Sequence, residues 1–293
     1  MSVHAAYVLV RLVHFGAIYL LFGLSVYTEC LTPASFRGEC RARTRTWLLS
    51  SSLIAGLGAL ALLLLQAGQM GNGWSDAWDP ATWLAVLGTA FGQVWRWQLV
   101  LSGLAVCVAL FGPLRYRHTA LLLLSILILL CMAFVGHAAV HEGALGVLAR
   151  FNQAVHLYAG AYWLGCLIPL WLTLSYLKTD RRSEVIRTHV KFSTLGHIAV
   201  AGVIVSGMIN IDLVLGKWPF HWESAYQRLL LLKMMLVGLM LLLALMNRYV
   251  LVPAMNRNSE RANRVFGRAV ALEILLGIGV LALVSAFATL API

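Results

Sequence analysis

The sequence predicts an all-α polytopic membrane protein with eight transmembrane helices. Of its 293 residues, 61% are hydrophobic and only 11% are charged, whereas a water-soluble domain carries about a quarter charged residues. A helix needs about 20 mostly apolar residues to cross a bilayer, and long continuous runs exclude a barrel, whose strands alternate. Eight runs meet this length, at about 4–29, 47–69, 93–112, 119–139, 147–177, 192–216, 226–252 and 264–290.

The basic residues between the runs orient the predicted helices. Sixteen of them lie in the turns after runs 1, 3, 5 and 7, and four lie in the alternate turns. The positive-inside rule places the sixteen in the cytoplasm and therefore both termini in the periplasm. The net charge of +11 is thus interpreted as topology signals that also contact anionic membrane lipid, and no nucleic-acid partner is expected.

Runs 1 and 5 share a pattern. Gly23 follows His14 by nine residues, and Gly165 follows His156 by the same interval. Both runs enter from the same side, which suggests two parallel four-helix repeats of the kind seen in some transporters. The chain is thus predicted to be one transmembrane domain, 1–293, with halves of about 1–140 and 147–293.

The segment between runs 2 and 3 predicts a short helix at the membrane surface. Asp79 and Pro80 have the residue types that favour the N-cap and the first position of a helix. Trp78 and Trp83 flank this start, and tryptophan prefers the membrane–water interface. We expect this helix to lie in the interface.

Several polar residues fall inside the apolar runs, where an ionisable group is costly and faces protein or water. Lys233 could pair with Glu273 across two helices, and Asp212 competes as its partner. Such residues fix helix register and close polar networks, with transport or proton movement as the alternative role. The predicted intramembrane network consists of Arg11, Asn210, Asp212, Lys233, Asn247 and Glu273.

Histidines are the strongest candidates for metal ligands. His137, His141 and His156 surround one short outer turn between runs 4 and 5, and imidazole binds copper, zinc, iron and nickel. His14 and His4 on run 1 complete the predicted metal set. The alternative for each is a structural histidine that hydrogen-bonds a neighbouring helix. Cys131, Cys166 and Met208 are candidates for later ligands along a path through the membrane.

A second alternative is b-type haem, because histidines from facing helices can ligate haem iron. His14, His137, His156 and His197 offer two candidate pairs. No Walker loop, GxSxG or HExxH pattern occurs, so a soluble enzyme is not indicated and a transporter is expected.

The chain resembles the CopD/PcoD copper-resistance and copper-homeostasis inner-membrane family over essentially its whole length. One departure is Cys166 after Trp163-Leu164-Gly165, where the family usually has a second glycine. The matching residues are Arg11-Leu12-Val13-His14-Phe15, Gly136-His137-Ala138, His156 before Trp163-Leu164-Gly165, Phe192-Ser193 with Gly196-His197, Ser206-Gly207 with Asn210, Tyr226 through Leu230-Leu231-Leu232-Lys233, Asn247 through Pro253, Glu273, and Ala288-Thr289-Leu290 before Pro292.

The resemblance implies a multi-pass bacterial inner-membrane protein with eight helices that handles copper. Such proteins are placed beside a small periplasmic copper carrier of the CopC type, and their proposed role is to move copper from periplasm to cytoplasm. The resemblance does not distinguish Cu(I) from Cu(II). It leaves open a third role, in which the chain is a membrane scaffold for the periplasmic carrier.

Overall fold

The computed structural model describes residues 1–136, 141–216, 224–256 and 260–290, and this part of the chain consists of helices joined by short turns, with no strand. The helices follow the order of the predicted runs. Their bounds are α1 Val3–Val26 with η1 Tyr27–Leu31, α2 Ala34–Met70, α3 Trp74–Ala77, α4 Pro80–Gly88, α5 Ala90–Phe111, α6 Arg117–Met132, α7 Gly143–Thr173 with η3 Leu174–Lys178, α8 Arg182–Leu215, α9 Ala225–Met246 with η4 Asn247–Leu251 and α10 Val252–Asn256, and α11 Glu260–Phe287.

Seven helices in the described chain are long and apolar enough to cross a membrane. The all-α polytopic class is therefore confirmed, whereas the count of eight spans stays a prediction. The predicted span that is not among the seven is α6, which has 16 residues and is about 24 Å long at 1.5 Å per residue. The run predicted to reach residue 139 stops being helical after Met132, and Gly136 has φ 82°.

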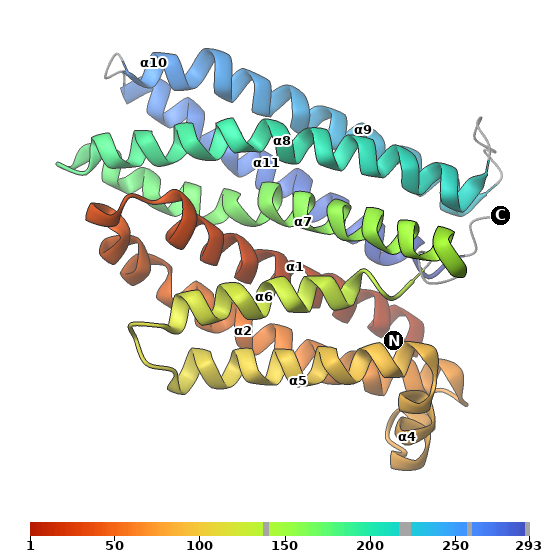
Figure 1. Cartoon of the computed structure of the whole chain (residues 1–293). Helices are drawn as coiled ribbons and strands as arrows, with labels where there is room; N and C mark the ends of the chain where they lie inside the picture. The colour runs from red at the N-terminus through yellow and green to blue at the C-terminus, as the bar shows by residue number, and fades with distance from the viewer. Residues whose placement is uncertain (137–140, 217–223, 257–259, 291–293) are drawn as a thin grey trace.

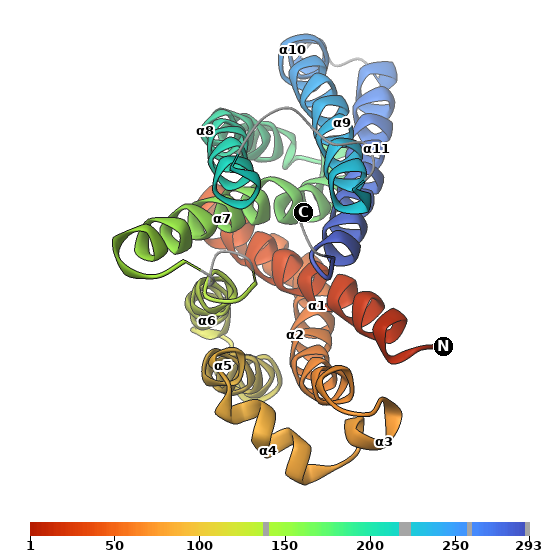
Figure 2. The same cartoon turned by 90° about the vertical axis from the view of Figure 1, so that its right-hand side faces the viewer.

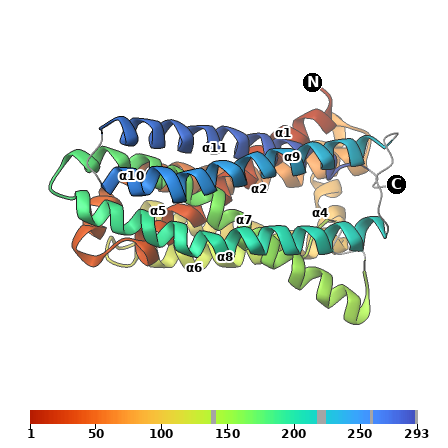
Figure 3. The ribbon, with the colours of Figure 1, turned by 90° about the horizontal axis from the view of Figure 1, so that it is seen from above.

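The helices lie side by side with their long axes in similar directions (Figure 1). The N- and C-terminal ends lie at one end of the bundle, and the turns that carry most of the basic residues lie at the other (Figure 1). The short helix α4 is at the terminal end as well (Figure 3). Asp79 caps α4 by accepting from the backbone amides of Ala81 and Thr82, as predicted. Which end faces the periplasm stays a prediction from the charges.

Helices α1 and α7 occupy the middle of the bundle (Figure 2). α2, α5 and α6 lie to one side of this pair, and α8, α9 and α11 lie to the other. The two central helices cross at Gly23 and Gly165. A Cβ on Gly165 would lie 2.1 Å from the Tyr19 carbonyl oxygen, and one on Gly23 would lie 2.0 Å from the Gly165 carbonyl carbon. Only glycine allows so close a backbone approach.

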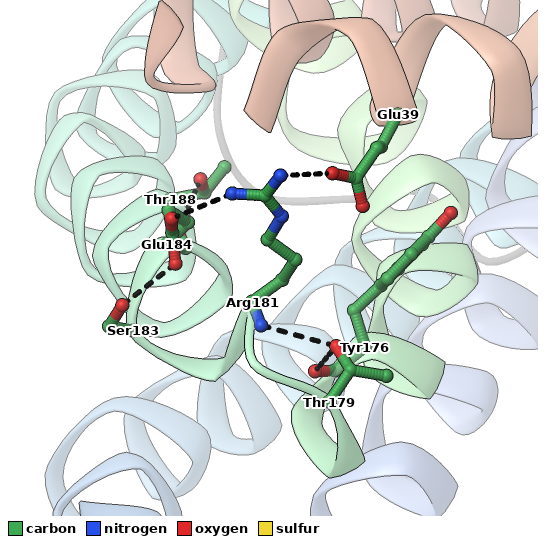
Figure 4. A network of polar contacts seen from close by, with 7 residues as sticks. All are labelled: Glu39, Tyr176, Thr179, Arg181, Ser183, Glu184 and Thr188. Carbon is green, nitrogen blue, oxygen red and sulfur yellow. Dashed lines mark hydrogen bonds and ion pairs between the residues drawn. The ribbon is translucent and has the colours of Figure 1, made fainter. Parts of the chain in front are cut away.

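A polar network joins the two sides at the basic end. Arg181, just before α8, forms an ion pair of 2.7 Å with Glu39 of α2 and a second of 3.4 Å with Glu184 (Figure 4). The hydrogen bond that Arg181 donates to Glu39 raises the pKa of Arg181 above its ordinary value. The Arg181 backbone amide donates to the Thr179 hydroxyl, and this hydroxyl donates to the Tyr176 carbonyl. These contacts anchor the α7–α8 turn against α2.

Candidate metal-binding cavity

A cavity of about 400 Å³ lies in the half of the bundle that contains α8, α9 and α11. Helix α8 packs on α7, and α9 packs on α11 (Figure 2). The cavity, here called the first cavity, is bounded by these four helices, by α1 and by the end of α6. Most of its wall is apolar, so the few polar groups on it define what it can bind.

His156 of α7 lines the first cavity. Its Nδ1 is 2.9 Å from the Ser206 hydroxyl oxygen of α8. The Ser206 hydroxyl itself donates to the Gly202 carbonyl, so it accepts from His156, and Nδ1 carries the proton. The ring also makes a hydrogen bond with the Val203 backbone. With Nδ1 protonated, Nε2 has a lone pair, and no hydrogen bond of Nε2 itself is resolved in the described residues. A neutral imidazole oriented this way is a competent metal ligand.

Four methionines also line the first cavity, namely Met132, Met208, Met234 and Met240. Only Met208 was among the predicted ligands. Met132 was set aside because helical spacing turns it away from His137. Met234 and Met240 of α9 were missed because they belong to no MxxM or MxM array, so no spacing in the sequence links them to His156. Thioether sulfur is a soft ligand that selects Cu(I). His141 lines the cavity too.

His14 is placed differently from His156, although both precede a crossing glycine by nine residues. It is fully buried, its Nδ1 donates to the Ala55 carbonyl at 3.0 Å, and its Nε2 accepts from the Gln98 amide at 3.2 Å. Both ring nitrogens are therefore occupied by α2 and α5. The structure does not bring His14 to the first cavity; its contacts are those of a histidine that joins helices.

The other predicted histidines are also apart from one another. His4 Nε2 lies 3.5 Å from the Thr289 hydroxyl near the chain ends. His197 donates from Nδ1 to the Ser193 carbonyl at 2.8 Å and accepts at Nε2 from the Tyr249 hydroxyl at 3.2 Å. His137 lies outside the described residues. Both ring nitrogens of His14 and of His197 are hydrogen-bonded to protein groups, so neither is free to ligate haem iron. In the described chain no group of three or more His, Cys, Asp or Glu side chains is placed to hold a metal ion.

The two candidate cysteines do not line the first cavity. Cys166 is fully buried where α1 and α7 cross, and its thiol lies 3.5 Å from the Gly23 carbonyl oxygen. The thiol at the position of the family's second glycine thus contacts backbone across the crossing. Cys131 of α6 is half-buried. Of the three predicted later ligands, the structure brings only Met208 to His156.

An amide network supports the His156–Ser206 pair. Asn152 donates to the Ser206 carbonyl and to the Asn210 side-chain oxygen, each at 2.9 Å. Asn210 donates in turn to the Gln153 side-chain oxygen at 3.0 Å. Asn210 and Gln153 line the cavity, so α7 and α8 are held together by polar groups beside its histidine. Asp212 is exposed on the same helix and forms no ion pair in the described chain.

A second cavity of about 250 Å³ lies toward the basic end. Trp163, Ile204 and Leu241 line both cavities and lie between them. Glu273 is on the wall of the second cavity, 2% exposed, and accepts a hydrogen bond from the Asn247 side-chain amide. Lys233 is on the wall of the first, near the Phe287 ring. The expected Lys233–Glu273 pair is therefore wrong, because the two groups face different cavities.

The Asn247–Glu273 hydrogen bond gives a testable expectation for stability. Asn247→Leu is expected to lower the free energy of unfolding by about 1–3 kcal/mol, because a buried carboxyl loses one of its two donors and keeps only the Trp163 side chain. The measurement is chemical unfolding of the purified protein in detergent. In the double variant Asn247→Leu/Glu273→Leu part of this loss should be recovered, since replacing both partners by apolar groups is nearly neutral. A single variant as stable as the wild type would contradict the role given to this bond.

The fold and the first cavity define a class of protein. The chain is an α-helical, multi-pass inner-membrane protein with a cavity whose wall offers imidazole and thioether groups. It belongs to the copper resistance protein D family. The model for the N-terminal domain of copper resistance protein D-like proteins matches residues 1–147, and the model for copper resistance protein D matches residues 186–287.

Similar proteins cover most of the chain. Inner membrane protein YebZ of Escherichia coli (strain K12) is 37% identical over 286 residues, which are 98% of each chain. Copper resistance protein D of Pseudomonas syringae pv. tomato is 31% identical over 97% of this chain and 96% of its own. Copper transport protein CutJ of Bacillus subtilis (strain 168) is 31% identical over 85% of this chain and 46% of its own. No solved structure matches.

Proposed function

We propose that this chain handles copper by binding Cu(I) in the first cavity and moving it across the inner membrane. The observation that carries the proposal is that His156, with Nε2 left to bind a metal, lines a cavity that four methionines also line. Imidazole and thioether together suit Cu(I), which prefers soft ligands. Relatives named copper resistance protein D and copper transport protein support a copper substrate.

His156 is proposed as the anchoring ligand, with Met208 and His141 as further ligands. His137, predicted from the sequence as part of the same site, stays a candidate outside the described residues. His14 and His4 have less support, because their ring nitrogens meet protein groups away from the cavity. Cu(I) would enter at the end where His141 lies, received from a periplasmic carrier of the CopC type.

The path proposed for copper runs from the first cavity to the second. Trp163, Ile204 and Leu241 line both cavities, and we propose that copper passes these side chains. This path lies within the half that contains α7, α8, α9 and α11, with α1 contributing one wall. Two cavities in series along the bundle, separated by a few shared side chains, suit a transporter that opens alternately to each side.

Metal analysis of purified protein tests the proposal. Protein loaded anaerobically with Cu(I) is expected to retain a stoichiometric amount of copper after desalting, and its absorption spectrum is expected to lack a Soret band. Proteoliposomes should then accumulate copper faster than empty vesicles. Protein that retains no copper, or that carries haem, would overturn the assignment. Copper binding without any uptake would instead favour the scaffold role.

A further inference from the structure

The first cavity contains positive charge without a described counter-charge. Arg11 of α1 and Lys233 of α9 both line it, and none of its described lining residues is Asp or Glu. Arginine remains protonated in proteins, so Arg11 carries a charge at any physiological pH, and Lys233 adds a second when it is protonated. A cavity of this composition attracts anions more readily than bare metal cations.

Neither cation has a carboxylate partner within the described chain: Arg11 lies near Phe15 and Tyr7, and Lys233 lies near Phe287 and His156. The Arg11 guanidinium carbon is 5.2 Å from the centre of the Phe15 ring, and the Lys233 ammonium is 6.0 Å from that of Phe287. The ion pairs of the described residues all involve other cations: Arg41, Lys178, Arg181 and Arg264. A charge removed from water is costly unless it is paired. Among the described residues, Arg11 and Lys233 therefore lack the oppositely charged partner that their position requires.

The wall around these cations determines which anion fits. It is mainly aliphatic and aromatic, with Asn210, Gln153 and His156 among the few polar groups, and part of their hydrogen-bonding capacity is already used. A strongly hydrated anion such as sulfate or phosphate would lose its hydration water on entering the cavity, and the wall has too few hydrogen-bond donors to replace that water. A small monovalent anion with weakly held water loses less on entering such a site, and two cations can neutralise it.

The positive charges of Arg11 and Lys233 also affect the binding of copper in the first cavity. A cuprous ion held by the neutral groups His156 and Met208 would add a third positive charge beside Arg11 and Lys233. We propose that the first cavity binds a small, weakly hydrated monovalent anion, such as a halide, between Arg11 and Lys233, and that Cu(I) occupies the cavity together with it. The second part rests on the proposed copper function; the anion site itself does not.

Calorimetry on copper-free protein tests the anion site. Protein in phosphatidylcholine nanodiscs, equilibrated in gluconate, is titrated with chloride and with bromide at constant ionic strength. The wild type is expected to give saturable heat with one site per chain. Arg11→Met and Lys233→Met should bind chloride at least about tenfold more weakly, because each loses a charge-assisted contact. Lys233→Arg keeps the charge and is expected to retain binding.

Arg96→Met is the matched control, because Arg96 is an exposed cation outside the cavity. It should bind chloride as the wild type does, and all variants are checked for folding by gel filtration. Saturable binding that is unchanged in Arg11→Met and Lys233→Met, or absent from the wild type, would overturn the proposal. Loss of chloride binding in phosphatidylglycerol nanodiscs would identify a lipid headgroup as the occupant and would also overturn it.

A copper titration separates this inference from the proposed function. The Cu(I) affinity of the wild type is expected to be at least about tenfold higher in chloride than in gluconate, a difference of about one charge-assisted contact. Equal copper affinity in both media, with chloride binding intact, would overturn joint occupancy alone. Chloride binding without any copper binding would overturn the copper proposal and leave the anion site standing.

Discussion

His156→Ala is expected to lower the Cu(I) affinity of the purified protein by at least about 100-fold. Loss of a group that only orients a metal ligand typically costs 10–100-fold in affinity, and His156 is proposed as the ligand itself. His156 lines the first cavity, and because its Nδ1 is engaged by Ser206, Nε2 is the nitrogen left to bind a metal. The measurement is competition with a chelator of known Cu(I) affinity.

Ser206→Ala should have a smaller effect in the same assay, about 10–100-fold, since it removes the group that fixes the tautomer and orientation of His156. His14→Ala is the matched control. His14 precedes a crossing glycine by nine residues, as His156 does, but the His14 ring is hydrogen-bonded to Ala55 and Gln98 and does not line the cavity. The His14→Ala change should reduce thermal stability and leave the copper affinity of the folded protein unchanged. Equal losses of affinity in His14→Ala and His156→Ala would contradict the site described here.

Gly165→Ala and Gly23→Ala are expected to disrupt the crossing of α1 and α7. A methyl group at either position would lie 2.0–2.1 Å from backbone of the other helix, and backbone cannot rotate away as a side chain can. Overpacking within a core typically costs about 1–3 kcal/mol, and displacing two central helices should reach the upper end of this range. Thermal unfolding in detergent, followed by loss of the monodisperse gel-filtration peak, measures the effect.

Gly16→Ala provides the control on the same helix. A Cβ at Gly16 would meet nothing within 4 Å, and alanine favours a helix over glycine by about 1 kcal/mol. This variant should be as stable as the wild type or more so. If Gly165→Ala unfolded at the wild-type temperature, the two helices would have to be separated by more than the structure shows.

The sequence predicted the membrane class and most helix positions because these depend on local properties. An apolar run of sufficient length crosses a membrane whatever its neighbours are, and Asp79-Pro80 starts α4 through contacts within one turn. The end of α6 was predicted about seven residues too late. Apolar residues continue past Met132 in the sequence, and only the turn at Ala133 to Gly136 ends the helix.

The site could be predicted only in part. His156, Met208, Arg11, Asn210 and Lys233 were singled out from the sequence, and all five line the first cavity. Met132, Met234 and Met240 were not, because methionine in an apolar run is indistinguishable from packing. The Lys233–Glu273 pair was wrong for a related reason: helical spacing gives the depth of a residue in the membrane and not the cavity that it faces.

By itself, the sequence determined that the chain is a helical membrane protein, which segments are apolar enough to cross, and how its charges divide between the two ends. All three properties follow from residue composition over short windows, since the free energy of transfer into hydrocarbon is approximately a sum over individual residues. Only the tertiary structure decided which histidine lines a cavity and keeps a ring nitrogen for a ligand. His14 and His156 have the same spacing to a crossing glycine, and they differ because α2 and α5 close around one, whereas a cavity faces the other.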